Sequence, residues 1–439
     1  MQVIFDAFGN SGDPYYSSTS SSSAAGTLAG PSFEAKVLLP LKTLAYGVAC
    51  HCFCDYFQMS TTSARVSCKK FHLTLSKCFK KEFLRLPTPA DLHSVTTLHQ
   101  KAHGVNGMIG SLDCMHTYWK NCPVGWQQSF QGKDKGESTV VLEAVADHYL
   151  WFWHASYGYG GSLNDINVLQ LSPLMKRLTD GTFTETEKES GVAPFDIGEF
   201  GSFDQTFMLV DGIYPSWSRF IRGFKEPITV PEARFSTWQE GARKDVERAF
   251  GVFQRKWKAI ASPIHFIEPT SIGEMVTCCL ILHNMGVSDR VMGDVNMRYD
   301  PGSVPFTARS ITSLHDIDNE VDDDDHCEEV QQGQEDNNLL LLPPVAQEPP
   351  PVEPAAVTGI GRMDSTIQLA IIRKKEIDIL HNKGEWARLQ KALIKYIDST
   401  YRCPAAVDTD DEEWCDVTNQ PGGGAVEDDD SSSGGGGVE

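Results

Sequence analysis

Three acidic residues have the setting and spacing of a metal-dependent phosphodiester site. Asp113 ends an apolar run that begins at Met108, and Asp211 ends a second apolar run at residues 207–210. Glu247 follows Asp211 after thirty-five intervening residues, within an amphipathic helical pattern. Because a buried strand presents its last residues at the edge of a sheet, these carboxylates could together hold two Mg²⁺ or Mn²⁺ ions. Acidic residues are common in this chain, so three unrelated surface acids are the alternative.

The segments around these acids predict an α/β core. Strand-like runs occupy residues 108–113, 138–146, 149–156 and 207–211, and the first three are expected to form an antiparallel meander. A helix is expected at residues 164–178, with Asn164 and Asp165 as its cap, and a last core helix at residues 272–285. The helix that carries Glu247 has an apolar stripe that should face the sheet, formed by Ala242, Val246, Ala249, Phe250, Phe253 and Trp257.

A helical unit precedes this core. Helical patterns at residues 38–57 and 64–83 are separated by the polar turn at residues 60–62, which predicts a helix-turn-helix-like DNA-binding unit within residues 33–100. Basic residues that could contact DNA phosphates gather on its second helix: Arg65, Lys69, Lys70, Lys77, Lys80 and Lys81. Arg243 and Arg248, beside Glu247, are expected to meet phosphates as well. The alternative is an ordinary solvated helix face.

Charge and composition divide the rest of the chain. Residues 33–289 are close to neutral, whereas residues 290–439 carry nearly all of the net charge of −21. A local basic face on the core is therefore compatible with an acidic protein. We expect a flexible Gly/Ser-rich arm at residues 1–32, a nuclease domain at residues 101–289, a disordered acidic and proline-rich linker at residues 290–362, a helical segment at residues 363–404 and a disordered acidic tail at residues 405–439.

The twelve cysteines show no disulfide-like spacing. With no signal-peptide pattern and no apolar run of about 20 residues, the sequence predicts a soluble intracellular protein without a membrane partner. Two groups could suggest zinc: Cys50, His51, Cys52 and Cys54, and Cys114, His116 and Cys122. Small core residues are the preferred interpretation of the first group, and ordering of the loop after Asp113 is the alternative for the second. His116 could also touch a phosphate.

Six segments, in this order, resemble the PIF/Harbinger superfamily of transposases, also described as plant transposon proteins or Harbinger-like nucleases. They are GMIGSLDCMHTYWKNCPVGW, VVLEAVADHYLWFWHASYG, GSLNDINVL, LVDGIYPSW, RKDVERAFGVFQRKW and CCLILHNM. The resemblance runs from about Leu38 to Val287. Family members usually have more sequence before the segment that corresponds to residues 4–9, so a shortened start is expected.

The resemblance implies a ribonuclease-H-like DDE core, with a mixed sheet and flanking helices, in which Asp113, Asp211 and Glu247 are the catalytic metal ligands. It also implies a nuclear, metal-dependent transposase that cuts DNA at terminal inverted repeats and joins it to a target. A separately encoded Myb-like accessory protein and a homo-oligomer are the expected partners. The alternative function is a non-catalytic, transposase-derived DNA-binding or assembly protein.

Overall fold

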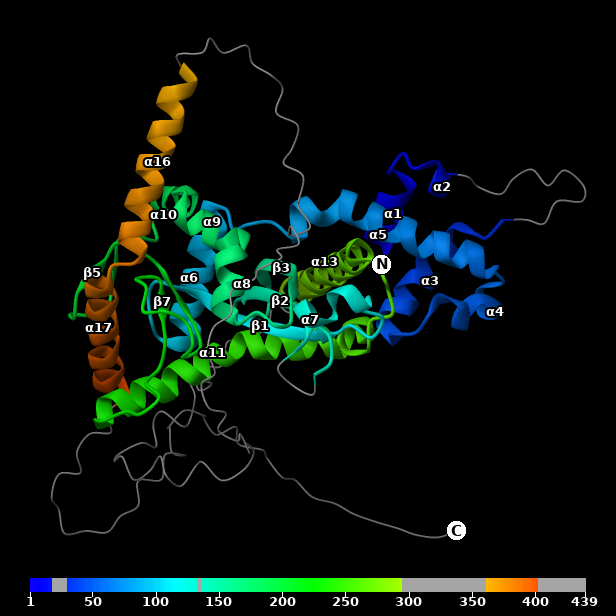
Figure 1. The fold of residues 1–439 in the computed structure, drawn as a ribbon. Coiled ribbons are helices and arrows are strands. Elements are labelled where there is room, and N and C mark those ends of the chain that lie inside the picture. The colour runs from blue at the N-terminus through cyan, green and yellow to red at the C-terminus, as the bar shows by residue number, and fades with distance from the viewer. Residues whose placement is uncertain (18–29, 133–135, 294–360, 402–439) are drawn as a thin grey trace, which may run out of the picture. The chain divides into compact units, whose positions relative to one another are not determined.

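A mixed five-stranded β-sheet organises the chain (Figure 1). The computed structural model describes residues 1–17, 30–132, 136–293 and 361–401. The strand order is β3-β2-β1-β6-β7, with β1 (Met108–Tyr118), β2 (Thr139–Ala146), β3 (Phe152–Gly160), β6 (Phe207–Leu209) and β7 (Phe220–Ile221). The first three strands form the predicted antiparallel meander, whereas β6 and β7 add in parallel. This confirms the predicted α/β class with a mixed sheet, and the arrangement is compatible with a ribonuclease-H-like core.

Helices cover both faces of this sheet. On one face lie α11 (Val230–Lys256) and α13 (Pro269–Gly293), where Phe250 shares an apolar cluster with Leu142 of β2. On the other face lie α6 (Pro89–His103), α8 (Asp165–Leu171), α9 (Pro173–Thr179) and α10 (Thr182–Ser190), where Leu92 clusters with Val145 of β2. Because alternate residues of a strand point to opposite faces, neighbouring positions of β2 supply two separate cores. The smaller elements around them are η2 (Val124–Trp126), α7 (Gln127–Phe130), β4 (Phe195–Asp196), β5 (Ser202–Phe203) and α12 (Lys258–Ala261).

The long helix α11 forms where the sequence predicts it. Thr229 and Glu232 make a reciprocal capping box at its start, and a proline lies in its first turn. The predicted apolar stripe faces the sheet: Ala242, Val246, Ala249, Phe250 and Phe253 are all buried. Asn284 in α13 makes a polar packing contact: its side-chain amide accepts from the backbone N–H of Phe152 and donates to the carbonyls of Phe152 and Phe83.

The N-terminal elements are α1 (Gln2–Gly9), α2 (Pro14–Ser17), α3 (Phe33–Tyr46), η1 (Cys50–Phe53), α4 (Cys54–Phe57) and α5 (Thr61–Phe83). Residues 1–32 were expected to be a flexible arm, but α1 buries Ile4 and Phe8 in the core, with the Phe8 ring 5.3 Å from that of Phe71. The Gly/Ser-rich composition of the whole segment conceals this short apolar face; residues 18–29 lie outside the described part of the chain. The α3 and α5 helices pack together, and α5 is one continuous helix capped by Ser60. The helix-turn-helix assignment stays a prediction.

Two helices occupy the segment predicted to be helical near the C-terminus: α16 (Gly361–Leu380) and α17 (Lys383–Tyr401). The second covers the edge strand of the sheet, since Trp386 donates from Nε1 to the Phe220 carbonyl at 2.9 Å and Leu389 and Leu393 join an apolar cluster with Trp238. Helix α17 therefore stabilises the edge of the sheet. The predicted linker falls almost wholly, and the predicted tail wholly, outside the described residues.

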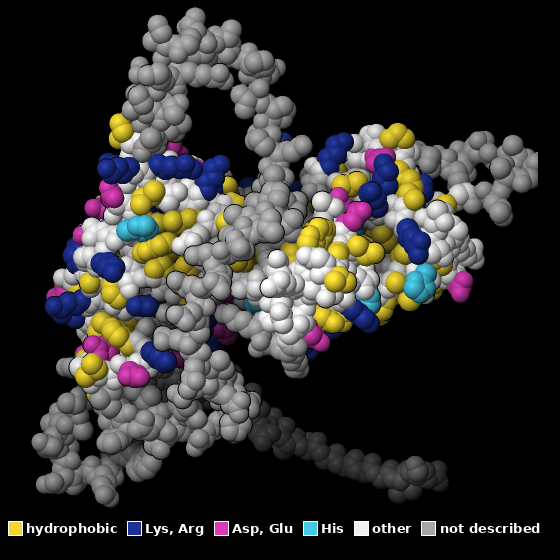
Figure 2. Space-filling model, viewed as in Figure 1, with side chains coloured by type: hydrophobic (Ala, Val, Ile, Leu, Met, Phe, Trp, Pro, Cys, Tyr) yellow, Lys and Arg dark blue, Asp and Glu magenta, His cyan; other side chains and the backbone are white. Residues whose placement is uncertain are grey.

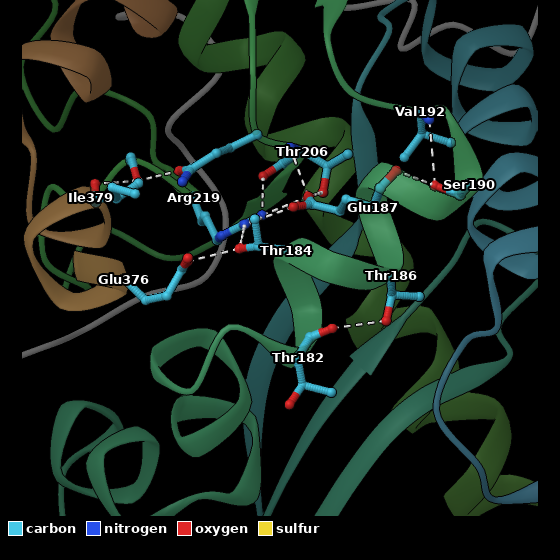
Figure 3. Close-up of polar contacts among 12 residues, drawn as sticks. Thr182, Thr184, Thr186, Glu187, Ser190, Val192, Thr206, Arg219, Glu376 and Ile379 are labelled. Atoms are coloured by element: carbon cyan, nitrogen blue, oxygen red, sulfur yellow. Dashed lines mark hydrogen bonds and ion pairs between the residues drawn. The ribbon is translucent and has the colours of Figure 1, made fainter. Parts of the chain in front are cut away.

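A buried ion pair supports the same edge (Figure 3). Arg219, beside β7, donates from Nη1 and Nη2 to the two carboxylate oxygens of Glu187 on α10, at 2.6 and 2.7 Å, and both residues are almost fully buried. Glu187 also accepts hydrogen bonds from the backbone and hydroxyl of Thr206. Thr184 extends this network to Glu376 of α16 at 2.8 Å.

Among the described residues, no helix is long and apolar enough to cross a membrane.

Candidate active site

An irregularity in β1 decides which way Asp113 points. Met108 pairs with Phe207 and Ser111 pairs with Leu209, so β1 has one more residue than β6 between these two pairs. Side chains alternate along a strand, and one additional residue reverses the faces of those that follow. As a result Ser111, Asp113 and the residues in phase with them face α11.

Glycine makes this bulge possible. Gly110 has a φ of +144°, and a Cβ atom there would lie 2.7 Å from the backbone oxygen of Ala146 on the neighbouring strand. Only glycine tolerates both the backbone conformation and the close approach. The outcome is visible one residue later, because Ser111 Oγ lies 3.5 Å from the carbonyl of Ala242 on α11. Asp113, two residues further, faces the next turn of that helix.

Asp113 and Glu247 meet at one cation. Nη1 of Arg243 lies 2.7 Å from Oε1 of Glu247 and 3.6 Å from Oδ2 of Asp113. The Asp113 side chain is 20% exposed and that of Glu247 43%, so both carboxylates are accessible to a ligand. Burial, together with the charge of Glu247, raises the pKa of Asp113 to about 6, against the opposing effects of a backbone hydrogen bond from Cys114 and the charge of Arg243. The site therefore has an excess of negative charge that a cation relieves.

Asp211 lies directly after β6, which is the parallel neighbour of β1. The pair Ser111–Leu209 is the last one between these strands, and Asp211 lies two residues beyond it in the direction of β6, as Asp113 does on β1. The Asp211 side chain is exposed and accepts a hydrogen bond from the backbone N–H of Gly212 at 2.6 Å. Thus two of the three predicted acids follow from adjacent parallel strands and the third from the helix that crosses them.

Oxygen-only ligands of this kind suit Mg²⁺ or Mn²⁺, so the residues present fit the ions that the resemblance implies. The three carboxylates are still apart, however. Among the described residues, the group whose ligand atoms all lie within 4.8 Å of one another is His103, His148 and Asp245. The sequence analysis did not identify this second group, because its three residues come from segments far apart in the chain and no local spacing joins them.

A fourth acid approaches the site. The helix α8 is capped by Asn164, whose side chain accepts from the backbone N–H of Asn167 at 2.8 Å, so the capping role expected of Asp165 belongs to its neighbour. The charge of Asp165 contributes to the raised pKa values of Asp113 and Cys114. It thus adds to the negative potential at this end of the sheet.

The predicted DNA-contacting residues have two kinds of environment. On α5, Arg65, Lys69, Lys77 and Lys81 are exposed and Lys80 is half-buried, on the side of the helix away from its buried residues. Lys70 pairs with Asp13 at 3.2 Å. Figure 2 shows Lys and Arg side chains at this end of the molecule, interrupted by acidic and apolar ones. Arg243 lies between the acids as described, and Arg248 pairs with Asp245 at 2.7 Å.

Neither cysteine group forms a cluster of metal-binding atoms within the described structure. Cys54 is buried in an apolar cluster with Leu39, as the core interpretation predicted, but His51 and Cys52 are exposed, so that interpretation is wrong for these two residues. Cys114 contacts the Tyr214 hydroxyl at 3.7 Å, and His116 contacts Thr139 Oγ1 at 2.9 Å. The described cysteines carry free thiols.

Comparison with known proteins bears on this core directly. Residues 81–294, which include the whole sheet together with α11 and α13, match the family model described as plant transposon protein. Over these residues the chain is similar to the plant transposon protein family. The chain is also 20% identical, over 265 residues, to the "Protein ALP1-like" of Arabidopsis thaliana. That match covers 60% of this chain and 63% of the relative, so the chain spans less than two thirds of the relative's length. No solved structure matches the chain.

The match to this family model confirms the resemblance to transposon-encoded proteins that the six sequence segments indicated. All six segments lie within the matched residues, since the first begins at residue 107 and the last ends at residue 285. The protein is therefore transposase-related. The roles of the individual acids and basic residues are not part of that conclusion.

Proposed function

We propose that this transposase-related chain is a divalent-metal-dependent DNA nuclease of Harbinger type that cuts and joins phosphodiesters at the ends of a transposable element. The observation that carries the proposal is the convergence of Asp113 and Glu247 on one cation, Arg243, at distances of 3.6 and 2.7 Å. Asp211 supports it by its position after the strand adjacent to that of Asp113. The family match supports the DNA-directed reaction class.

In this proposal Asp113, Asp211 and Glu247 would hold two Mg²⁺ or Mn²⁺ ions, which when bound would activate a nucleophilic oxygen and stabilise the leaving oxygen of the scissile phosphodiester. Asp113 fixes the position of the site, because it lies on the most central strand of the sheet. Arg243 would be displaced from the carboxylates and turn toward a phosphate. The basic face of α5 would hold the DNA backbone, and the nucleus would be the site of action.

A specific observation favours the alternative function as well. The Arg243 guanidinium lies between Asp113 and Glu247, and acids neutralised by a cationic side chain would also suit a transposase-derived protein that binds DNA but does not cut it. The two functions differ in one measurable property, which is cleavage that depends on the three acids.

The test is a cleavage assay on duplex DNA that carries the element's own flanking repeats, with Mg²⁺, Mn²⁺ or EDTA, and with a Myb-like accessory protein present or absent. Asp113→Asn, Asp211→Asn and Glu247→Gln should each remove cleavage and leave DNA binding intact. Glu240→Gln is the matched control, because Glu240 is an exposed acid on α11. Asp147 serves less well, since it is buried and accepts hydrogen bonds from Trp151 and Trp153. DNA binding without cutting by the wild-type protein would select the alternative function.

A further inference from the structure

A second group of metal-binding side chains lies on the other side of α11 from Glu247. Asp245 is buried, and its Oδ2 lies 2.7 Å from Nε2 of His103 and 3.0 Å from Nδ1 of His148. His103 is in the last turn of α6, and His148 is in the turn between β2 and β3. One carboxylate oxygen thus joins three elements that are far apart in the sequence.

The geometry points to a transition-metal site: we propose that His103, His148 and Asp245 bind one Zn²⁺ ion. The three ligand atoms all lie within 4.8 Å of one another, which an ion with bonds of about 2 Å to nitrogen and oxygen can span. Two imidazole nitrogens and one carboxylate are a zinc-type ligand set, whereas Mg²⁺ prefers oxygen ligands alone. This distinguishes the site chemically from the acids on the other side of the helix.

The surroundings orient these ligands. Oδ1 of Asp245 is held by Arg248 at 2.7 Å, which leaves Oδ2 as the oxygen available to an ion. His99, one turn before His103 on α6, is buried; its ring stacks on that of His103 with centroids 5.8 Å apart, and its Nε2 accepts from the backbone N–H of His148 at 3.3 Å. His99 is a positioning residue, because it fixes both the ring of one ligand and the backbone of another.

Proton balance and affinity follow from the same contacts. In the metal-free protein both imidazoles donate an N–H to Oδ2 of Asp245, so both of these nitrogens must be deprotonated and point at the ion when it binds. His103 then carries its proton on Nδ1, a buried atom for which the described structure has no hydrogen-bond partner. Missing support of this kind costs roughly ten- to a hundredfold in metal affinity, so we expect weaker binding than at a fully supported structural zinc site.

A bound ion would hold the helix of Glu247 against the sheet. Asp245 and Glu247 share α11, and the two histidines come from α6 and from the β2–β3 turn. The ion would replace two hydrogen bonds by three stronger metal–ligand bonds and would therefore raise the melting temperature of the whole core. This effect does not depend on DNA cleavage.

The experiment uses the full chain, freed of metal with EDTA, and titrates it with Zn²⁺ under calorimetric and thermal-shift detection. The wild-type protein should bind one more equivalent of Zn²⁺ than His148→Gln or Asp245→Asn. Of these three proteins, only the wild type should show the corresponding rise in melting temperature. His93→Gln is the matched control, because His93 is an exposed histidine on the same helix α6. The double variant Asp113→Asn, Glu247→Gln should keep the zinc site.

Any Zn²⁺ taken up by cysteine thiols would be bound equally by the wild type and the variants, so the difference in stoichiometry isolates the proposed site. Co²⁺ gives a second readout. The difference between the Co²⁺ absorption spectra of the wild type and His148→Gln should contain no thiolate charge-transfer band, because the proposed site has no cysteine ligand. His148 is 20% exposed, whereas Asp245 is almost fully buried, so His148→Gln should disturb the fold less than Asp245→Asn. It therefore still tests the proposal if Asp245→Asn fails to fold. Equal zinc stoichiometry in the wild type and His148→Gln would overturn the proposal and leave a metal-free hydrogen-bonded cluster.

Discussion

Nη1 of Arg243 lies 3.6 Å from Oδ2 of Asp113 and so connects helix α11 to the central strand of the sheet. The same nitrogen lies 2.7 Å from Oε1 of Glu247, which means that one cation compensates two carboxylates. A divalent ion bound to these acids would neutralise the same charge. Arginine and metal ion therefore compete, and that competition can be measured without any DNA.

Replacing Arg243 by glutamine should lower the melting temperature of the metal-free protein and enlarge the rise that Mn²⁺ produces. The loss should correspond to about 1 kcal/mol, because the pair is partly exposed. Differential scanning calorimetry with and without Mn²⁺ measures both quantities. Arg255→Gln, at an exposed position of α11, is the control and should change neither. An unaltered Mn²⁺ response in Arg243→Gln would mean that no ion binds between these acids.

The raised pKa of Asp113 predicts a pH-dependent stability. Burial favours the protonated carboxyl in the folded protein, with a pKa of about 6 compared with 3.8 for the ordinary group. The stability that this protonation contributes is complete below the lower value and is lost as the pH rises through the higher one. Asp113→Asn imitates the protonated form, so in the absence of metal it should melt increasingly above the wild type between about pH 4 and pH 7, by the equivalent of about 1–3 kcal/mol at the upper end. A difference that shrinks with rising pH would contradict this account.

Two glycines near the site should respond in opposite ways to alanine. Gly110→Ala places a Cβ 2.7 Å from the Ala146 carbonyl at a φ of +144°, so it should destabilise the fold by about 2 kcal/mol or more and turn Asp113 away from α11. Gly251→Ala adds a Cβ with no neighbour within 4 Å near the C-terminal end of α11, and it should stabilise the protein by about 0.5–1 kcal/mol. Urea unfolding of the two variants gives both values. A Gly110→Ala variant as stable as the wild type would show that the bulge is not needed for the fold.

Gly110 also shows how far the sequence predicts this structure. Apolar periodicity predicted the meander and the buried stripe of α11, because burial on one face requires that spacing. The same alternation, counted from Met108, would place Asp113 on the wrong face, and only the bulge at Gly110 corrects the phase. The His103–Asp245 contact is of another kind: it joins residues 142 positions apart, and no local pattern contains it. The burial of α1 was likewise a tertiary effect, since Ile4 and Phe8 have nothing to pack on until α5 is formed.

The buried pair of Arg219 and Glu187 should contribute much more to stability than a surface pair. Glu187→Gln leaves the guanidinium without a charge partner in a site that is almost fully buried, and the cost should be about 3–5 kcal/mol. Glu385→Gln is the control, because Glu385 and Arg388 form an ion pair in which both side chains are 48% exposed, worth at most about 1 kcal/mol. Chemical denaturation of both variants measures the comparison. Similar losses in the two would show that the network at the β7 edge does not stabilise the sheet.

The exposed basic face of α5 gives the last prediction, which concerns DNA. Lys77→Gln combined with Lys81→Gln removes two exposed charges, and if both contact phosphates the slope of log K against log salt should become shallower by about 2 units, because fewer counterions are released. Lys391→Gln combined with Lys395→Gln removes two exposed charges from α17 and should leave the slope unchanged. The measurement is best made on a chain that ends at residue 402, since residues 403–439 contain eleven acidic and no basic residues and should compete with DNA for basic side chains. This shortened chain keeps α17 on the sheet edge. Equal slopes for the two double variants would show that these lysines of α5 do not contact DNA phosphates and form an ordinary solvated helix face.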